Sequence, residues 1–297
     1  MKTRLAIFIL AVIILPLAGL VLSGKALGEL WLSSPAGVEH IAAIMITTLI
    51  LLGYVLLVNL MVKRRTGYNP VKLQRDYYLS MATASAVLVW MLVYLNLYTE
   101  NWHTAQISIA AQILLFTPLF ALLAPAVLST RALLGSLPGL LKLLAGAKPL
   151  PILNGATLVL FLVPIATLGL LGGAVWPAQL FWLMWIAPLL LLVALQLLWN
   201  ESTIFSGLKS GDWGRVIFAA LAGVIVANLG VVSYQASGGK LTINLPNPLF
   251  AQLGYAIFGL LCLQLGDVVA ENWRGKTRGE LFQQKKKFPI PVVVRKN

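Results

Sequence analysis

Only two histidines occur in the chain, and each lies close to a glutamate at the start of a predicted membrane helix. His40 follows Glu39, and His103 comes three residues after Glu100. Two imidazoles at equal depth on different helices, with carboxylates beside them, suit copper, zinc or a bis-histidine heme. The alternative is ordinary interfacial polarity, since acidic residues favour helix starts and histidines tolerate the headgroup zone. We expect no resident cofactor, with copper or heme b as the chemistry that these four residues would support.

Other residues capable of acid–base chemistry are scarce inside the predicted helices. Up to residue 235, the central thirds of these helices contain no Asp, Glu, Lys or Arg. Asp267 lies four residues before Glu271 and is interpreted as a carboxylate near the interface, with a proton site as the alternative. The single cysteine, Cys262, excludes an internal disulfide and a multi-thiolate metal site. Because catalysis needs a positioned titratable group, we expect that the protein is not an enzyme.

The composition explains this scarcity. Of 297 residues, 59% are hydrophobic and only 10% are charged, whereas a soluble domain is about 25% charged. These values exclude a soluble enzyme, a nucleic-acid-binding domain and a disordered regulator. The formal charge of +13 is therefore interpreted as a signal of membrane topology rather than of a nucleic-acid partner.

Helices must supply the framework, because unbroken apolar runs of about 20 residues cross a bilayer as α-helices. The sequence predicts an all-α, polytopic membrane helix bundle with eight transmembrane helices. Their expected ranges are 5–23, 39–62, 77–98, 104–128, 152–173, 178–199, 214–235 and 248–271.

The placement of basic residues sets the expected orientation. If both termini are cytoplasmic, all of the 22 Lys and Arg residues except Lys25 and Lys240 fall on the cytoplasmic side. A wrong number of helices would scatter these charges over both sides. We therefore expect a multi-pass protein of the cell inner membrane, with the N- and C-termini in the cytoplasm.

Three segments outside the helix cores have their own character. The transmembrane domain is expected to span 1–271, with a Leu-rich, Lys-containing segment at about 131–150 lying on the inner membrane face or serving as a linker. The loop 236–248 alternates apolar and polar residues and could form an extended lid on the outer face. The tail 272–297 is basic and expected to be cytoplasmic, and its Lys285, Lys286 and Lys287 could bind anionic lipid or another membrane-protein subunit.

Amides and small residues within the helices have a structural interpretation. Asn and Gln side chains can bond across helices in a membrane, and glycines allow helices to approach closely. Adhesion between helices is the favoured role of the amides, with a substrate path as the alternative. The residues concerned are Asn59, Asn96, Gln106, Gln112, Gln196, Asn228, Gln252 and Gln264, together with Gly169, Gly172 and Gly173.

The stretch from Trp102 to Leu171 resembles the CtaG-like multi-pass membrane proteins, a family associated with assembly of heme-copper cytochrome oxidases and with copper delivery. The shared features are a helix ending in proline-Leu-x-x-Leu-x-Ala-Pro at Pro118–Pro125, a basic Leu-rich loop from Arg131, and a further apolar helix. The family has histidines where this chain has Ala105 and Ile109. The resemblance therefore implies a retained scaffold without the histidine ligands of the family.

Three functions remain compatible with the sequence. The favoured one is a non-catalytic membrane subunit or assembly factor of a larger complex, expected to be a respiratory complex such as a cytochrome oxidase. The second is a copper or heme b protein that uses His40 and His103 at the outer face. The third is a transporter of an apolar or weakly polar solute, which predicts a cleft lined by Gln and Asn from several helices.

Overall fold

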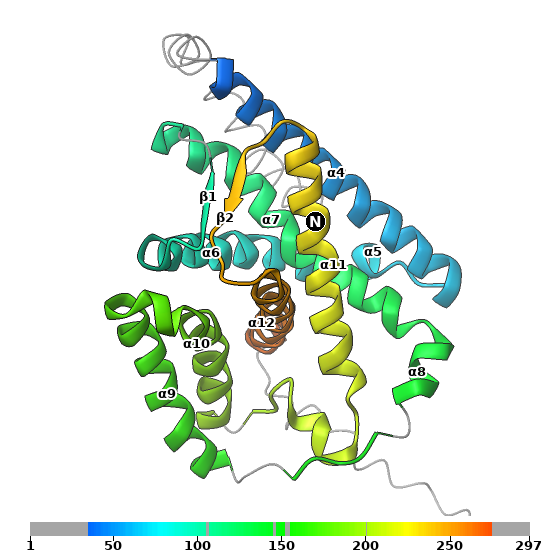
Figure 1. Ribbon diagram of the computed structural model, residues 1–297. Coiled ribbons are helices and arrows are strands. Elements are labelled where there is room, and N and C mark those ends of the chain that lie inside the picture. The colour runs from blue at the N-terminus through cyan, green and yellow to red at the C-terminus, as the bar shows by residue number, and fades with distance from the viewer. Residues whose placement is uncertain (1–34, 105–106, 145–146, 152–154, 200, 275–297) are drawn as a thin grey trace, which may run out of the picture.

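The computed structural model describes residues 35–104, 107–144, 147–151, 155–199 and 201–274 (Figure 1). Within these residues the regular secondary structure is helical apart from two short strands. The helices are α4 Pro35–Thr66, α5 Pro70–Leu73, α6 Arg75–Thr99, α7 Ile109–Gly135, α8 Pro138–Leu144, α9 Gly155–Val175, α10 Pro177–Leu198, α11 Gly214–Ala236 and α12 Pro248–Arg274. The strands are β1 Trp102–Thr104 and β2 Leu241–Ile243, and η2 Ser206–Ser210 is a 3-10 helix.

Seven helices of the described chain are long and apolar enough to cross a membrane, namely α4, α6, α7, α9, α10, α11 and α12. They coincide with the last seven of the eight predicted spans. The all-α, multi-pass membrane architecture is therefore confirmed. The first predicted span, 5–23, lies outside the described residues, so the number eight and the position of the termini stay predictions.

Helix α7 is displaced along the sequence from its predicted range of 104–128. It begins at Ile109 because Ser108 caps it, with the Ser108 side chain accepting a hydrogen bond from Ala111 N at 3.3 Å. Residues 102–104 instead form a strand. The helix ends at Gly135, so Arg131 is part of it, and α8 is the short helix within the predicted segment 131–150.

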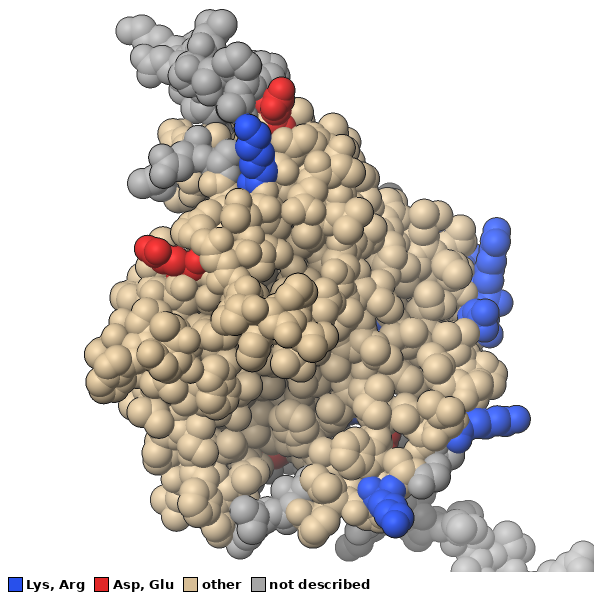
Figure 2. Space-filling view, in the orientation of Figure 1, with Lys and Arg blue, Asp and Glu red and all other residues tan. Residues whose placement is uncertain are grey.

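The outer faces of the spanning helices are apolar. In the most apolar window of each helix, only 22% to 56% of the residues are buried inside the bundle. On the face seen in Figure 2, a wide surface without Lys, Arg, Asp or Glu lies between charged side chains at its edges. An apolar surface of this extent is stable against lipid but not against water.

Basic residues gather at one end of the bundle, which we call the basic end. The opposite end, where β1 and β2 lie, is called the strand end (Figure 1). Among the described residues, Lys240 is the basic residue at the strand end, whereas those of the basic end are Lys63, Arg64, Arg65, Lys72, Arg75, Arg131, Lys142, Lys148, Lys209, Arg215 and Arg274. This asymmetry supports a cytoplasmic basic end, which stays a prediction.

Amide side chains bond across helices, as the sequence predicts. Asn59 of α4 donates to Ser129 Oγ of α7 at 2.7 Å. Asn228 of α11 and Gln252 of α12 exchange two hydrogen bonds of 2.7 and 3.2 Å. Gln264 of α12 also bonds to Gln196 of α10. Such contacts stabilise helix packing in lipid, where the backbone supplies few free partners.

Ser85 of α6 supplies hydrogen-bond partners to the backbone of α7 beside Pro125. The Pro125 ring prevents normal closure of the preceding turn. The Ser85 hydroxyl enters this turn, donating to Phe120 O at 2.5 Å and accepting from Ala124 N at 3.0 Å. Ser85 is fully buried, so its hydroxyl replaces the water that an exposed helix would use.

Ser85→Ala is expected to lower the free energy of unfolding by about 1–3 kcal/mol, because Phe120 O and Ala124 N lose their partner in apolar surroundings. Equilibrium unfolding of the detergent-solubilised protein measures this value. Thr83→Ala is the control, since Thr83 is exposed on the same helix and bonds only to Leu79 O of its own helix. Two variants of equal stability would show that the serine bridge has no energetic role.

Candidate functional site

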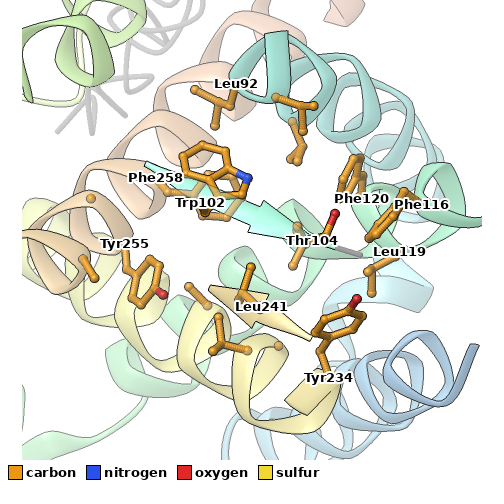
Figure 3. Close-up of a pocket in the computed structure, with 18 of the residues that line it drawn as sticks. Leu92, Trp102, Thr104, Phe116, Leu119, Phe120, Tyr234, Leu241, Tyr255 and Phe258 are labelled. Atoms are coloured by element: carbon orange, nitrogen blue, oxygen red, sulfur yellow. The ribbon is translucent and has the colours of Figure 1, made fainter. Parts of the chain in front are cut away.

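A cavity of about 350 Å³ lies between the helices in the half of the bundle nearest the strand end (Figure 3). Its wall is formed by α4, α6, α7, α10, α11 and α12, together with β1 and β2. Small-molecule pockets in proteins generally have volumes of about 300–1,000 Å³. The cavity is therefore large enough for a small ligand.

The wall of the cavity is mainly apolar, and eight of its lining residues are aromatic. Among the described residues, no Asp, Glu, Lys, Arg, His or Cys lines it. Phe116 and Phe120 stack on α7 with ring centroids 5.3 Å apart, and Trp90 of α6 packs edge-on against Phe120 at 5.2 Å. The other aromatic lining residues are Trp102, Trp185, Tyr234, Tyr255 and Phe258.

The two strands cover one side of this cavity. They pair antiparallel, with Trp102 opposite Ile243 and Thr104 opposite Leu241. Figure 3 shows Trp102 and Leu241 among the side chains around the cavity. The extended segment that the sequence predicts in the loop 236–248 is thus present, as the lid strand β2.

Asn96, near the end of α6, holds the lid in place. Its side-chain oxygen accepts from Asn101 N at 3.0 Å and Trp102 N at 3.3 Å, and its amide donates to Trp102 O at 2.8 Å. Glu100 ends the helix with a left-handed φ of 50°, which turns the chain into β1. Among the described residues, Asn96 therefore anchors the segment that follows its own helix instead of forming the bond to a second helix that the sequence predicts.

His40 of α4 is buried, with only 1% of its surface exposed. Its Nδ1 shares a hydrogen bond with the Tyr234 hydroxyl of α11. The Phe116 ring lies 5.9 Å from the His40 ring between centroids. The His40 Nε2 atom is buried and has no hydrogen-bond partner among the described residues. His40 therefore stands directly behind Tyr234 in the cavity wall.

The four predicted metal-binding residues occupy different environments. His103 lies on β1 opposite Thr242 and is exposed, and Glu39 and Glu100 are exposed as well. Within the described part of the chain, no group of three or more His, Cys, Asp and Glu residues could hold a metal ion. The structure thus supplies no preassembled centre from these residues. Copper or heme b binding stays a prediction.

Two further predictions concern the charged residues Asp267 and Lys285–Lys287. Asp267 of α12 forms an ion pair with Arg215 of α11, and Arg131 of α7 interacts electrostatically with both residues. The sequence interpretation places Asp267 near the interface but does not identify Arg215, which is 52 positions away, as its partner. Lys285, Lys286 and Lys287 lie outside the described residues.

Comparison with known proteins yields no match: no family model, curated protein or solved structure matches this chain. The resemblance to the CtaG-like family therefore stays a prediction. The function must be argued from the cavity and the residues around it.

Proposed function

We propose that this chain is a non-catalytic, multi-pass membrane protein that binds an apolar molecule of the bilayer in the cavity beneath the two strands. One observation carries the proposal: a mainly apolar cavity of about 350 Å³, lined by no charged residue of the described chain, lies between six membrane-type helices. In a bilayer, lipid surrounds a bundle of such helices. An apolar molecule can therefore exchange between the bilayer and the cavity without crossing water.

The chemistry of the wall favours binding over catalysis. Acid–base catalysis needs a group that exchanges protons near its operating pH, and the described lining residues include no carboxylate, imidazole or amine. The amides that the transporter hypothesis assigns to a polar cleft are used mainly between helices, as in Asn59–Ser129 and Asn228–Gln252. An apolar cargo therefore fits the wall better than a polar one.

Gly230→Phe is expected to abolish ligand binding while preserving the fold. Gly230 lines the cavity, and a Cβ atom added there would have no neighbour within 4 Å. The phenyl group can therefore occupy ligand space without displacing a helix. Trp90, Trp102 and Trp185 line the same cavity, so a dibromododecane in lipid nanodiscs should quench part of the tryptophan fluorescence saturably. This saturable component should disappear in Gly230→Phe.

Gly53→Phe is the matched control. Gly53 lies on α4, has equally open space around its Cα and is not a lining residue. It should retain the saturable quenching. A wild-type protein quenched only in linear proportion to the bromoalkane would contradict the proposal. Saturable quenching that is seen only after residues 1–34 are removed would also contradict it. The occupant of the cavity would then be a segment of this chain and not a separate ligand.

Two other hypotheses, a subunit of a larger complex and a copper or heme b protein, can be tested separately. A role as a subunit or assembly factor of a respiratory complex predicts co-purification with redox subunits after gentle solubilisation. A copper or heme b role predicts bound copper or visible absorbance that His40→Ala and His103→Ala remove. Binding of an apolar molecule is compatible with a role in a larger complex, because the cavity occupies only one part of the bundle.

A further inference from the structure

The cavity wall carries hydrogen-bonding groups from several elements. Thr47 of α4, Thr104 of β1, Gln112 of α7 and Tyr234 of α11 all line it. Figure 3 shows the Tyr234 hydroxyl directed toward Leu119, on the side of the cavity where Phe116 and Thr104 also lie. The labelled residues Trp102, Tyr255 and Phe258 lie away from this side. Trp102 and Tyr255 nevertheless carry a ring nitrogen and a hydroxyl. The lining residues Asn101 and Trp185 also have buried donors, Nδ2 and Nε1, without a hydrogen-bond partner among the described residues. A ligand in the cavity would therefore meet hydrogen-bonding groups on more than one side, and the Tyr234 hydroxyl is one that a second side chain, His40, holds in place.

Two further polar lining residues, Thr47 and Gln112, are partly satisfied by the protein and retain hydrogen-bonding capacity. Thr47 donates its hydroxyl to Ala43 O at 2.7 Å, and Gln112 donates its amide to Ile107 O at 3.1 Å. Both side chains keep oxygen lone pairs that can accept a further hydrogen bond. Because the Thr47 hydroxyl already donates its one hydrogen, Thr47 can serve a ligand only as an acceptor, whereas the Gln112 amide keeps a second N–H and can also donate.

His40 holds Tyr234 in place, and in the hydrogen bond between them the Tyr234 hydroxyl can be either the donor or the acceptor. If Tyr234 donates to His40 Nδ1, its oxygen can accept a hydrogen bond from a ligand. If His40 donates instead, the Tyr234 O–H remains free to donate. A ligand hydroxyl, which both donates and accepts, fits either arrangement, whereas a carbonyl oxygen fits only the second.

We infer that the ligand is a neutral, largely apolar alcohol, with its hydroxyl bound by Tyr234 and its hydrocarbon part against the apolar side chains of the wall. This inference rests on the proposed function. A charged headgroup does not fit, because a buried charge requires a partner and the described lining residues supply none. His40 acts as a positioning residue for the Tyr234 hydroxyl.

Three brominated probes of equal chain length test the inference: dibromododecane, dibromododecanol and dibromododecanoate, each at the same mole fraction in nanodiscs at pH 8. Saturable tryptophan quenching should occur at about fivefold lower mole fraction for the alcohol than for the alkane, as expected for one additional hydrogen bond. The carboxylate should give no saturable quenching, because its charge would be unpaired in the cavity.

Tyr234→Phe distinguishes a hydrogen bond from general packing. The variant should bind the alcohol and the alkane equally while retaining the alkane affinity of the wild type, which also shows that the cavity is intact. Equal wild-type affinities for alcohol and alkane, or saturable binding of the carboxylate, would overturn the inference and leave the proposed function standing. Failure of all three probes would instead refute the proposed function.

Discussion

Gly223→Ala is expected to lower the free energy of unfolding by about 3 kcal/mol or more, as severe overpacking does. Gly223 of α11 and Gly259 of α12 meet where the backbones of the two helices touch. A Cβ atom at Gly223 would lie 2.6 Å from the Cα atom of Gly259. The obstacle is backbone rather than a flexible side chain, so the helices must separate to admit a single methyl group.

Gly230→Ala is the matched control for this prediction, because it places the same substitution on the same helix. A Cβ atom at Gly230 has no neighbour within 4 Å. Alanine favours helix over glycine by about 1 kcal/mol, so this variant should be as stable as the wild type or more so. Unfolding curves of both variants in a denaturing detergent give the comparison. Similar loss of stability in both would mean that the effect comes from helix flexibility and not from backbone contact.

The positions of the membrane helices could be predicted because length and apolarity suffice to define them. A span needs about 20 apolar residues, and the last seven predicted ranges coincide with helices of the structure. Gly169, Gly172 and Gly173 also have the predicted role: added Cβ atoms there would meet Leu183, Leu180 and Met184 of α10. Because glycine weakens a helix, its repeated use within an apolar helix indicates close packing without knowledge of the partner helix.

The cavity could not be predicted, because the sequence does not say which apolar face of a helix meets lipid and which meets protein. These helices are apolar all round, so no periodic pattern distinguishes the two faces. Phe116, Tyr234 and Trp102 meet at the cavity although they belong to different elements. The strand in the loop 236–248 was the one local signal, since its alternation of apolar and polar residues does not depend on tertiary contacts.

The same limit applies to His40, for which the sequence favours an interfacial position. Its place at the start of a helix beside Glu39 suggests a residue near the headgroups. In the structure it is buried against Tyr234, 194 positions later in the chain. A pairing over such a distance depends on how α4 and α11 cross, which local sequence does not specify.

Asp267→Asn is the second substitution expected to have a large effect, with a loss of about 3–5 kcal/mol in the free energy of unfolding. The Asp267 side chain is 7% exposed and that of Arg215 is 22% exposed, so water screens this pair poorly. Removal of the carboxylate charge leaves Arg215 of α11 and Arg131 of α7 as neighbouring cations that repel one another. The basic end should therefore loosen first, where α7, α11 and α12 meet.

Rescue by a second substitution separates this charge effect from simple loss of a hydrogen bond. In the Asp267→Asn background, Arg215→Gln removes one of the two cations and should recover a large part of the lost stability, because the remaining amide pair carries no net charge. Asp212→Asn is the control at the same end, since Asp212 also acts on Arg131 but is exposed. Exposed charge pairs contribute about 0–1 kcal/mol, so its effect should be small. Failure of Arg215→Gln to restore any stability would show that the carboxylate acts through bonds other than its pairing with Arg215.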